Sequence, residues 1–341
     1  MVDFRYHIVS LVSVFLALSV GIILGAGPLQ NSIGQALSGE VSNLRETNAD
    51  LKVEADELRT RAEQQDQAFD ALAPRLLEGS LKGRTIAIVR LPQVADETYD
   101  SVVDKIGMAG GSLGTVVAVN DVWTNSAQTA FRSAFADQLK SYVAEASDAT
   151  ETNAQLNGAL NQLVRQGDEE ANNSTVFELM TGADTPLLAA VGELGTRADA
   201  VIILSPDVVE AEPSESKPVD ADQVAQADYN VRTYADLANY LATKGPTVVL
   251  GAENSEHDVL TVMRNADSAA STVDSITTVA AHINAVIATA QAINGNTVNL
   301  GVGDGADAVV GEIVSAAVSE DKADDAQTED APADDGEGEG N

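Results

Sequence analysis

The sequence contains no cysteine, which excludes disulfides, thiolate nucleophiles and cysteine-based metal sites. Exported domains commonly rely on disulfides, so any part of this chain outside the cytoplasm must be held together by its packed core alone. Aromatic residues make up only 4% of the chain, whereas 44% of the residues are hydrophobic. We therefore expect a core built from alanine, valine, leucine and isoleucine.

Basic residues are scarce: 19 Lys and Arg stand against 53 Asp and Glu, which leaves a net charge of −34. Nucleic acids and anionic lipid headgroups are themselves polyanions, so this charge argues against both as direct partners. Ten of the acidic residues fall between Glu320 and Asn341, where Lys322 is the one basic residue. We expect a disordered acidic tail at 319–341 and a solvated acidic surface on the rest.

Residues that bind metals or carry catalysis are also few. A Cu(I) site needs thiolates or several thioethers, and a Cu(II) or zinc site needs clustered imidazoles. The three histidines and the three methionines after Met1 are scattered: His7, His257, His282, Met108, Met180 and Met263. The sequence also lacks a P-loop, a nucleophile elbow, an HExxH motif and a calcium loop. It therefore predicts no catalytic, cofactor-binding or metal site, and a protein that is not an enzyme.

Two short motifs resemble ligand sites. Gly301-Val-Gly303-Asp-Gly305-Ala306 is formally a G-x-G-x-x-A fingerprint, but it follows all the predicted strands, with only a short helix and the tail after it. Ser205-Pro206-Asp207 ends a predicted strand, where open sheets bind ligands. We interpret the first as a glycine-rich turn and the second as a strand-terminating turn.

An uncharged, strongly apolar stretch, Ile8 to Leu29, is long enough to cross the roughly 30 Å of membrane hydrocarbon as a helix. A cleavable export signal is the alternative, since Gly25 to Gly27 are small, but no clean A-x-A site is present. Length favours a retained transmembrane helix at 8–29. Arg5 and the amino terminus favour a short cytoplasmic end at 1–7 and a bulk outside the cytoplasm.

Within this run, small residues recur at every fourth position: Ser13, Ala17, Gly21 and Gly25. Such a ridge lets helix backbones approach closely in lipid, so it predicts a helix–helix interface. Helix pairs of this type usually cross with a right-handed angle, whereas a heptad coiled coil is left-handed. The ridge therefore has two candidate partners: a second copy of the chain, or the helix of a different protein.

A heptad seam follows the apolar run, and the sequence predicts a coiled coil at 35–78. If Leu37 is a d position, Asn48 is an a position, where a buried asparagine favours a parallel pair. Pro74, Gly79 and Gly83 should end the helix. The alternative is one amphipathic helix lying on its own globular domain. The interface residues that we predict in the seam are Leu37, Val41, Leu44, Asn48, Leu51 and Leu58.

From residue 84 the pattern changes to short apolar runs that alternate with helical stretches. Strands are predicted at 84–91, 113–120, 199–206, 247–254 and 271–279, and the longer helices at 127–142, 153–166, 224–243 and 282–293. This alternation predicts an α/β fold with a doubly wound, mostly parallel sheet over 84–318. An exposed acidic loop rich in proline and serine is expected at 208–222.

The stretches "FRYHIVSLVSVFLALSVGIILGAGPL", "GRTIAIVRLP" and "VDSITTVAAHINAVIATAQAINGNTVNLGVGDGADAVV" resemble the actinobacterial MctB family, which is labelled copper transport outer membrane proteins. The resemblance extends to about Val310, and the composition is similar to that of corynebacterial members, whose relatives include SteB-type proteins. It implies an envelope location, copper handling and, for SteB-type relatives, a role in daughter-cell separation with a SteA partner. A transmembrane barrel needs many alternating segments, which this chain lacks, and no copper ligand is carried over.

Two functions therefore stay open. The first is a membrane-anchored, homodimeric scaffold or regulator of the cell envelope with a SteA-like protein partner. The second is copper export or homeostasis, as the family label implies. For location we expect a single-pass protein of the cell membrane, with the outer membrane of a mycobacterial-type envelope as the alternative. A small-molecule enzyme or sensor is a third and weaker class.

Overall fold

The computed structural model describes residues 4–26, 28–144, 146, 149–206, 221–252, 258–266 and 268–317, leaving aside the side chains of 24–36 and 221. The chain divides into two compact units, Met1–Gln65 and Asp66–Asn341. We call the first the helical unit and the second the α/β unit. The predicted tail at 319–341 lies outside the described residues, as does the acidic loop at 208–222 up to residue 220.

The helical unit begins with α1, Phe4–Ala26. Within it, Phe4–Ile23 is long and apolar enough to cross a membrane, and none of this stretch is buried by the rest of the chain. Compared with this stretch, the predicted span at 8–29 starts and ends too far toward the carboxyl terminus. Pro28 instead begins the next helix, because a proline is well tolerated at the first helical position, where its missing N–H would have no partner.

That second helix, α2, runs without a break from Pro28 to Leu77, so its last turns belong to the α/β unit. Pro74 does not end it, contrary to the sequence interpretation. A proline inside a helix removes the bond from its own nitrogen to the carbonyl four residues earlier, here that of Asp70, and the three residues after Pro74 still keep the helical backbone. The helix ends before Gly79 and Gly83, the other two predicted terminators.

A seven-stranded sheet forms the centre of the α/β unit in the described residues, in the order β3-β2-β1-β4-β5-β6-β7. Neighbouring strands are parallel except β2 and β3, which are antiparallel. The mostly parallel α/β prediction is confirmed. The strands are β1 Thr85–Arg90, β2 Ser112–Val119, β3 Leu188–Ala190, β4 Ala200–Leu204, β5 Thr247–Leu250, β6 Ser271–Val273 and β7 Asn299–Leu300.

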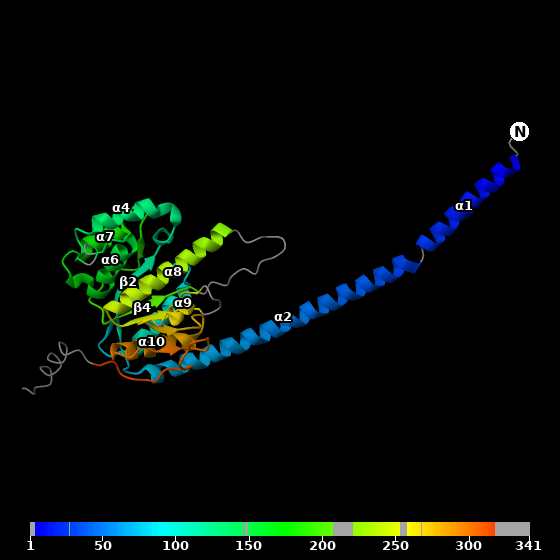
Figure 1. Ribbon diagram of the computed structural model, residues 1–341. Coiled ribbons are helices and arrows are strands. Elements are labelled where there is room, and N and C mark those ends of the chain that lie inside the picture. The colour runs from blue at the N-terminus through cyan, green and yellow to red at the C-terminus, as the bar shows by residue number, and fades with distance from the viewer. Residues whose placement is uncertain are drawn as a thin grey trace, which may run out of the picture. The chain divides into compact units, whose positions relative to one another are not determined.

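Helices cover both faces of this sheet (Figure 1), which is what the uninterrupted apolar strands require. Because side chains alternate along a strand, Ala87 and Val89 of β1 enter one core while Ile86 and Ile88 enter the other. One face packs against α4 Thr129–Leu139, α6 Thr152–Gln166, α7 Asn173–Thr181, α8 Ala221–Lys244 and α9 Val259–Asn265. The opposite face packs against α3 Asp96–Met108, α10 Val279–Ile293 and the end of α2.

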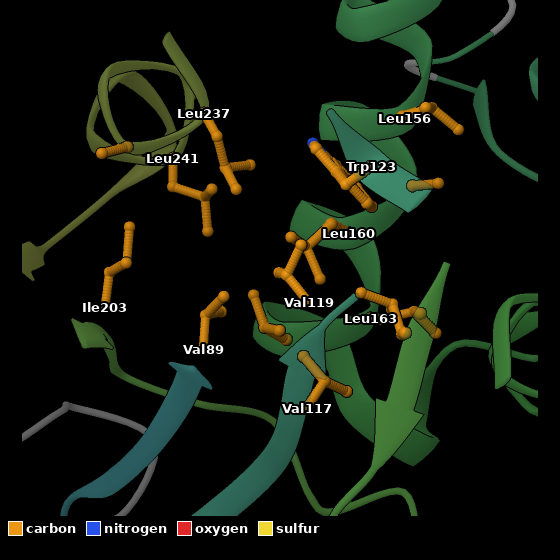
Figure 2. Close-up of a cluster of buried hydrophobic side chains, with 14 of the residues drawn as sticks. Val89, Val117, Val119, Trp123, Leu156, Leu160, Leu163, Ile203, Leu237 and Leu241 are labelled. Carbon is orange, nitrogen blue, oxygen red and sulfur yellow. The ribbon is translucent and has the colours of Figure 1, made fainter. Parts of the chain in front are cut away.

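The larger core contains the only tryptophan of the chain. Trp123 is fully buried and points toward α6, where Leu156, Leu160 and Leu163 line the facing side (Figure 2). The spacing of these leucines by three and four residues places them on one stripe of the helix. Aliphatic strand residues complete the cluster, as the low aromatic content predicts.

Most predicted elements are present with shifted ends. The predicted strand at 271–279 is only β6, because the chain turns at 274–278 before Val279 begins α10. The sequence interpretation did not identify β3, β7, α7 and α9, all of which are short. Strands of two or three residues carry too little alternation to be seen, and they exist because a neighbouring strand supplies their hydrogen bonds.

Candidate functional site

The glycine-rich motif at 301–306 binds a carboxylate of its own chain. The backbone N–H of Val302 donates to Oδ1 of Asp274 at 2.9 Å, and that of Gly303 donates to Oδ2 at 3.1 Å. A Cβ on Gly301 would lie 2.1 Å from this carboxyl group, so only glycine fits there. Successive N–H groups of this kind form an anion-binding nest, and here Asp274 already fills it.

Arg264 of α9 completes the arrangement. Its Nη1 and Nη2 donate to Oδ2 of Asp274 at 3.2 and 3.1 Å, and the hydroxyl of Ser275 donates to Oδ1 at 2.9 Å. Burial alone would raise the pKa of Asp274, but these hydrogen bonds and the arginine charge outweigh it and hold the pKa below its usual range. The interpretation as a turn therefore agrees with the structure. The short helix expected after it does not: described residues 301–317 contain none.

The other strand-end motif, which begins at Ser205, is also part of the sheet. Ser205 is buried, and its N–H donates to the carbonyl of Leu250, which extends the β4–β5 ladder by one bond. Asp207 lies outside the described residues. In the first motif Asp274 fills the backbone nest, and in the second the backbone of Ser205 is part of the sheet.

A third polar cluster, which sequence reasoning missed, holds the end of α2 against the α/β unit. We call Asp66, Asp70, Ser101, Lys105 and His282 the α2 anchor. A carboxylate oxygen of Asp66 accepts the N–H of Val279 at 3.0 Å, in the first turn of α10. An acidic group beside a helix N-terminus is favourable because it compensates the unpaired N–H groups there.

Lys105 of α3 makes the second link of the α2 anchor. Its Nζ is 2.7 Å from Asp70 and 3.1 Å from Asp104, and its side chain is only 2% exposed. Burial lowers the pKa of Lys105, but the hydrogen bonds to both carboxylates outweigh it and raise the pKa above its usual value. Lys105 therefore stays charged and ties α3 to α2.

His282 joins the two helices that the end of α2 contacts, α10 and α3. Its Nε2 lies 2.7 Å from the carbonyl oxygen of Ile276 and so donates, while Nδ1 lies 2.7 Å from the Ser101 hydroxyl and accepts. Burial lowers the pKa of His282, and the nearby Lys105 lowers it further, against the opposing effects of the Ile276 carbonyl and Asp66. The neutral imidazole is thus the form that the fold stabilises.

The family of the chain can now be stated. The profile of the family described as "Copper transport outer membrane protein, MctB" matches residues 1–311. The chain belongs to this family. It is also similar to the copper transporter MctB of Mycobacterium tuberculosis (strain ATCC 25618 / H37Rv) and of Mycobacterium bovis, with 27% identity over 334 residues, covering 90% of this chain and 98% of each relative. The Mycobacterium leprae protein of the same name matches over 130 residues, at 27% identity. The resemblance found in the sequence is confirmed.

The name of the MctB family raises the question of copper ligands. Across the described ranges, no three His, Cys, Asp or Glu residues lie close enough together to hold a metal ion. Met180 and Met263 are fully buried in the apolar core, and both ring nitrogens of His282 are engaged by Ser101 and Ile276. His257 lies outside the described residues. The described side chains therefore do not fit a copper site.

The predicted seam residues lie on α2 in the helical unit, and their large side chains face solvent. Leu44, Leu51 and Leu58 are 62%, 57% and 56% exposed, whereas Ala73 and Leu77 at the end of the same helix are fully buried. Asn48 is exposed with them, as are Leu37 and Val41.

The predicted ridge lies on α1. Ser13, Ala17 and Gly21 are exposed, and the Ser13 hydroxyl donates to the carbonyl of Val9 at 2.8 Å. Gly25 lies in the last turn of α1, among the residues whose exposure is left aside. A membrane or a partner helix would be needed to cover these residues. The helix–helix interface at the ridge therefore stays a prediction.

Proposed function

We propose that this MctB family member is a single-pass envelope protein whose amino terminus is cytoplasmic, and that it acts as a non-catalytic, dimeric scaffold or regulator. In this proposal the ridge of α1 and the seam of α2 pair two copies in parallel. The α/β unit then binds and positions a second envelope protein, SteA-like by the resemblance, in a process such as cell separation.

The observation that carries the proposal is the contrast along α2. One helix holds leucines at heptad spacing that are more than half exposed, and then alanine and leucine that are fully buried. Exposed leucines at this spacing bury their surface when a second helix supplies the matching seam, and each buried leucine stabilises the pair by about 1.5–3 kcal/mol. The acidic and basic residues between them suit the solvated face of a coiled coil.

The α2 anchor connects the helix that carries the seam to the α/β unit. Asp66 and Asp70 bond to α10 and α3, and Ala73 and Leu77 enter the core beneath them. Since the anchor and the seam share one uninterrupted helix, pairing of two seams would hold two α/β units as a pair. A paired surface of this kind is what a scaffold needs.

The cysteine-free sequence allows a direct test of pairing. In the full chain in detergent micelles, Leu44→Cys should form a disulfide between two copies under mild oxidation, because equivalent d positions meet in a parallel, in-register pair. Glu46→Cys is the matched control: it lies two residues away at an outward f position and should stay reduced.

Two results would count against the pairing. One is a Leu44→Cys chain that stays uncrosslinked at concentrations where wild type is solubilised. The other is equal crosslinking of both variants, which would indicate random collision. In cells, crosslinking followed by mass spectrometry should capture a membrane or envelope protein, and deletion should give chained cells with normal copper tolerance.

Copper export or homeostasis is the second candidate, and the names of the family and of its mycobacterial relatives favour it. It predicts a tight, stoichiometric copper site in the purified full chain, measured by calorimetry, and copper sensitivity with normal septation on deletion. Negligible binding would favour the scaffold. A location in the outer membrane, as the family description has it, belongs with this alternative.

A further inference from the structure

Residues 308–317, which we call the strap, follow α10 without regular secondary structure. Three amide side chains of α10 and its carboxyl-terminal cap bond to the main chain of the strap; we call Asn284, Gln291 and Asn294 the amide row. Asn284 donates to the carbonyl of Val309 at 2.7 Å and accepts the N–H of Gly311 at 3.4 Å. These bonds involve backbone atoms of the strap only.

The rest of the amide row repeats the pattern. Gln291 donates to the carbonyl of Glu312 at 2.8 Å. Asn294 donates to the carbonyl of Ser315 at 3.0 Å and accepts the N–H of Ala317 at 2.7 Å. An amide that donates to one peptide group and accepts from another binds the backbone of a segment whatever its side chains are. The amide row is therefore built to bind main chain.

Two features of the strap add selectivity. A Cβ on Gly311 would lie 2.7 Å from a methyl group of Leu300 and 2.8 Å from one of Ile287, so a larger residue would have to push both side chains aside. Further along, Val314 packs against the core and Ala316 is buried in it, and the N–H of Ala316 donates to the carbonyl of Ser80 at 2.8 Å. The bound pattern is glycine, then an aliphatic residue three positions later, then a small residue two positions after that.

The remaining side chains of the strap do not help to hold it. Val309, Val310 and Ile313 are 62%, 53% and 49% exposed. A segment held by backbone bonds and two inward side chains, with its larger apolar groups in solvent, resembles a bound peptide more than a core element. It also follows the glycine loop at 301–306, where the chain changes course.

We propose that the amide row is a binding site for an extended peptide segment of a partner protein, and that the strap occupies this site as a built-in competitor. The partner segment would carry the same pattern of glycine, aliphatic and small residues. This deepens the proposed function by naming a class of partner, and it rests on the α/β unit acting as a binding module. A tethered competitor has an effective concentration of about millimolar, so the free site is seen only when the strap is weakened.

The test uses the full chain and a fluorescent peptide of residues 309–317 as the probe. Gly311→Val in the chain should displace the strap, because its Cβ cannot be seated, while leaving the amide row intact. We expect this variant to bind the wild-type peptide at least 10-fold more tightly than the wild-type chain does, measured by fluorescence anisotropy. The peptide carrying Gly311→Val should not bind, and adding Asn284→Leu with Asn294→Leu to the chain should abolish binding.

Val310→Ala is the matched chain control, since Val310 is exposed one residue away, and it should behave like wild type. A Gly311→Val chain that is folded by circular dichroism and does not bind the peptide would overturn the proposal. If Gly311→Val does not fold, hydrogen exchange of the wild-type chain decides. The amides of Ala316 and Ala317 should then exchange by local opening, faster than those of β5; exchange of both only through global unfolding would refute a releasable strap.

Exchange of straps between two copies is a different occupant and gives a different result. It would appear as a dimer that persists after Leu44→Asn but dissociates after Gly311→Val, and it would contradict the assignment to a partner protein. Loss of disulfide formation at Leu44→Cys, by contrast, would remove the proposed coil and leave peptide binding by α10 unaffected. The two proposals can therefore fail separately.

Discussion

The two units of this chain treat apolar side chains in opposite ways. In the helical unit, leucines and valines of α1 and α2 stand in solvent, whereas in the α/β unit the same residue types are fully buried on both faces of one sheet. Burial of apolar surface is the main favourable term in folding. The α/β unit thus contains its own source of stability, and the helical unit needs lipid or a second helix to provide one.

The largest effect should come from the buried ion pair of the α/β unit. Asp274→Ala leaves Arg264 buried without its carboxylate partner and removes the anion from the glycine loop. Breaking a buried pair in this way costs about 3–5 kcal/mol. We expect this loss in the urea unfolding of the α/β unit, followed by circular dichroism. Asp304→Ala, in the same loop but with an exposed side chain, should change stability by less than about 0.5 kcal/mol.

Substituting one leucine of α2 in each unit compares the two units within a single helix. Leu77→Ala opens a cavity in the core and should lower the unfolding free energy of the α/β unit by about 2–5 kcal/mol. Leu58→Ala, at an exposed seam position, should leave that unfolding unchanged and weaken dimerisation, measured by sedimentation in detergent. Equal effects of the two variants on unfolding would show that the seam packs on its own globular domain, the alternative left open by the sequence.

We expect a smaller effect on the stability of the α/β unit from the protonation of His282 as the pH changes. Its folded-state pKa is below the usual 6.5, so the unfolded chain binds more protons there, and stability falls as pH drops below about 6.5 toward the folded value. His282→Gln keeps a donor and an acceptor for Ile276 and Ser101 and should flatten this dependence. The loss tied to Asp274 lies in a separate range, below its usual pKa of 3.8.

The measurement is the midpoint of thermal unfolding of the α/β unit between pH 7 and pH 5. His7→Gln, on the exposed α1, is the control and should follow wild type. An unchanged slope in His282→Gln would contradict the assignment of this pH dependence to His282.

The smallest change should come from Asn48→Leu. Under the proposed coil it replaces a buried polar pair, so it should leave the α/β unit unaffected and broaden the oligomeric state beyond the dimer. Asn43→Leu, at an outward c position, should have no such effect. Sedimentation of the full chain in detergent measures both; identical profiles for the two variants would argue against the assigned register.

Sequence periodicity was sufficient for what depends on neighbours along the chain. The uncharged run predicted the apolar helix, although Pro28 moved its end, and the alternating apolar runs predicted five of the strands and the mostly parallel sheet. The short β3 and β7 were missed, because two or three residues carry no period, and only pairing with β2 and β6 makes them strands.

The candidate sites depended on contacts between distant residues. The sequence identified the glycines at 301–306 but not their ligand, since Asp274 lies almost thirty positions earlier and meets them only through the β6–β7 pairing. Asp66 reaches Val279 across more than two hundred residues, and Ser101 reaches His282 across 181. Hydrogen bonds of this kind leave no trace in spacing.

By itself, then, the sequence determined the longer elements and their apolar faces, because periodicity is a local property of a helix or strand. It also determined the family, through motifs spread along the chain. Only the tertiary structure decided which polar groups meet: the glycine loop with Asp274, α2 with α10 and α3, and the amide row with the strap. The reason is physical, since a polar side chain finds its partner in space, and its partner is set by how the sheet and its helices pack.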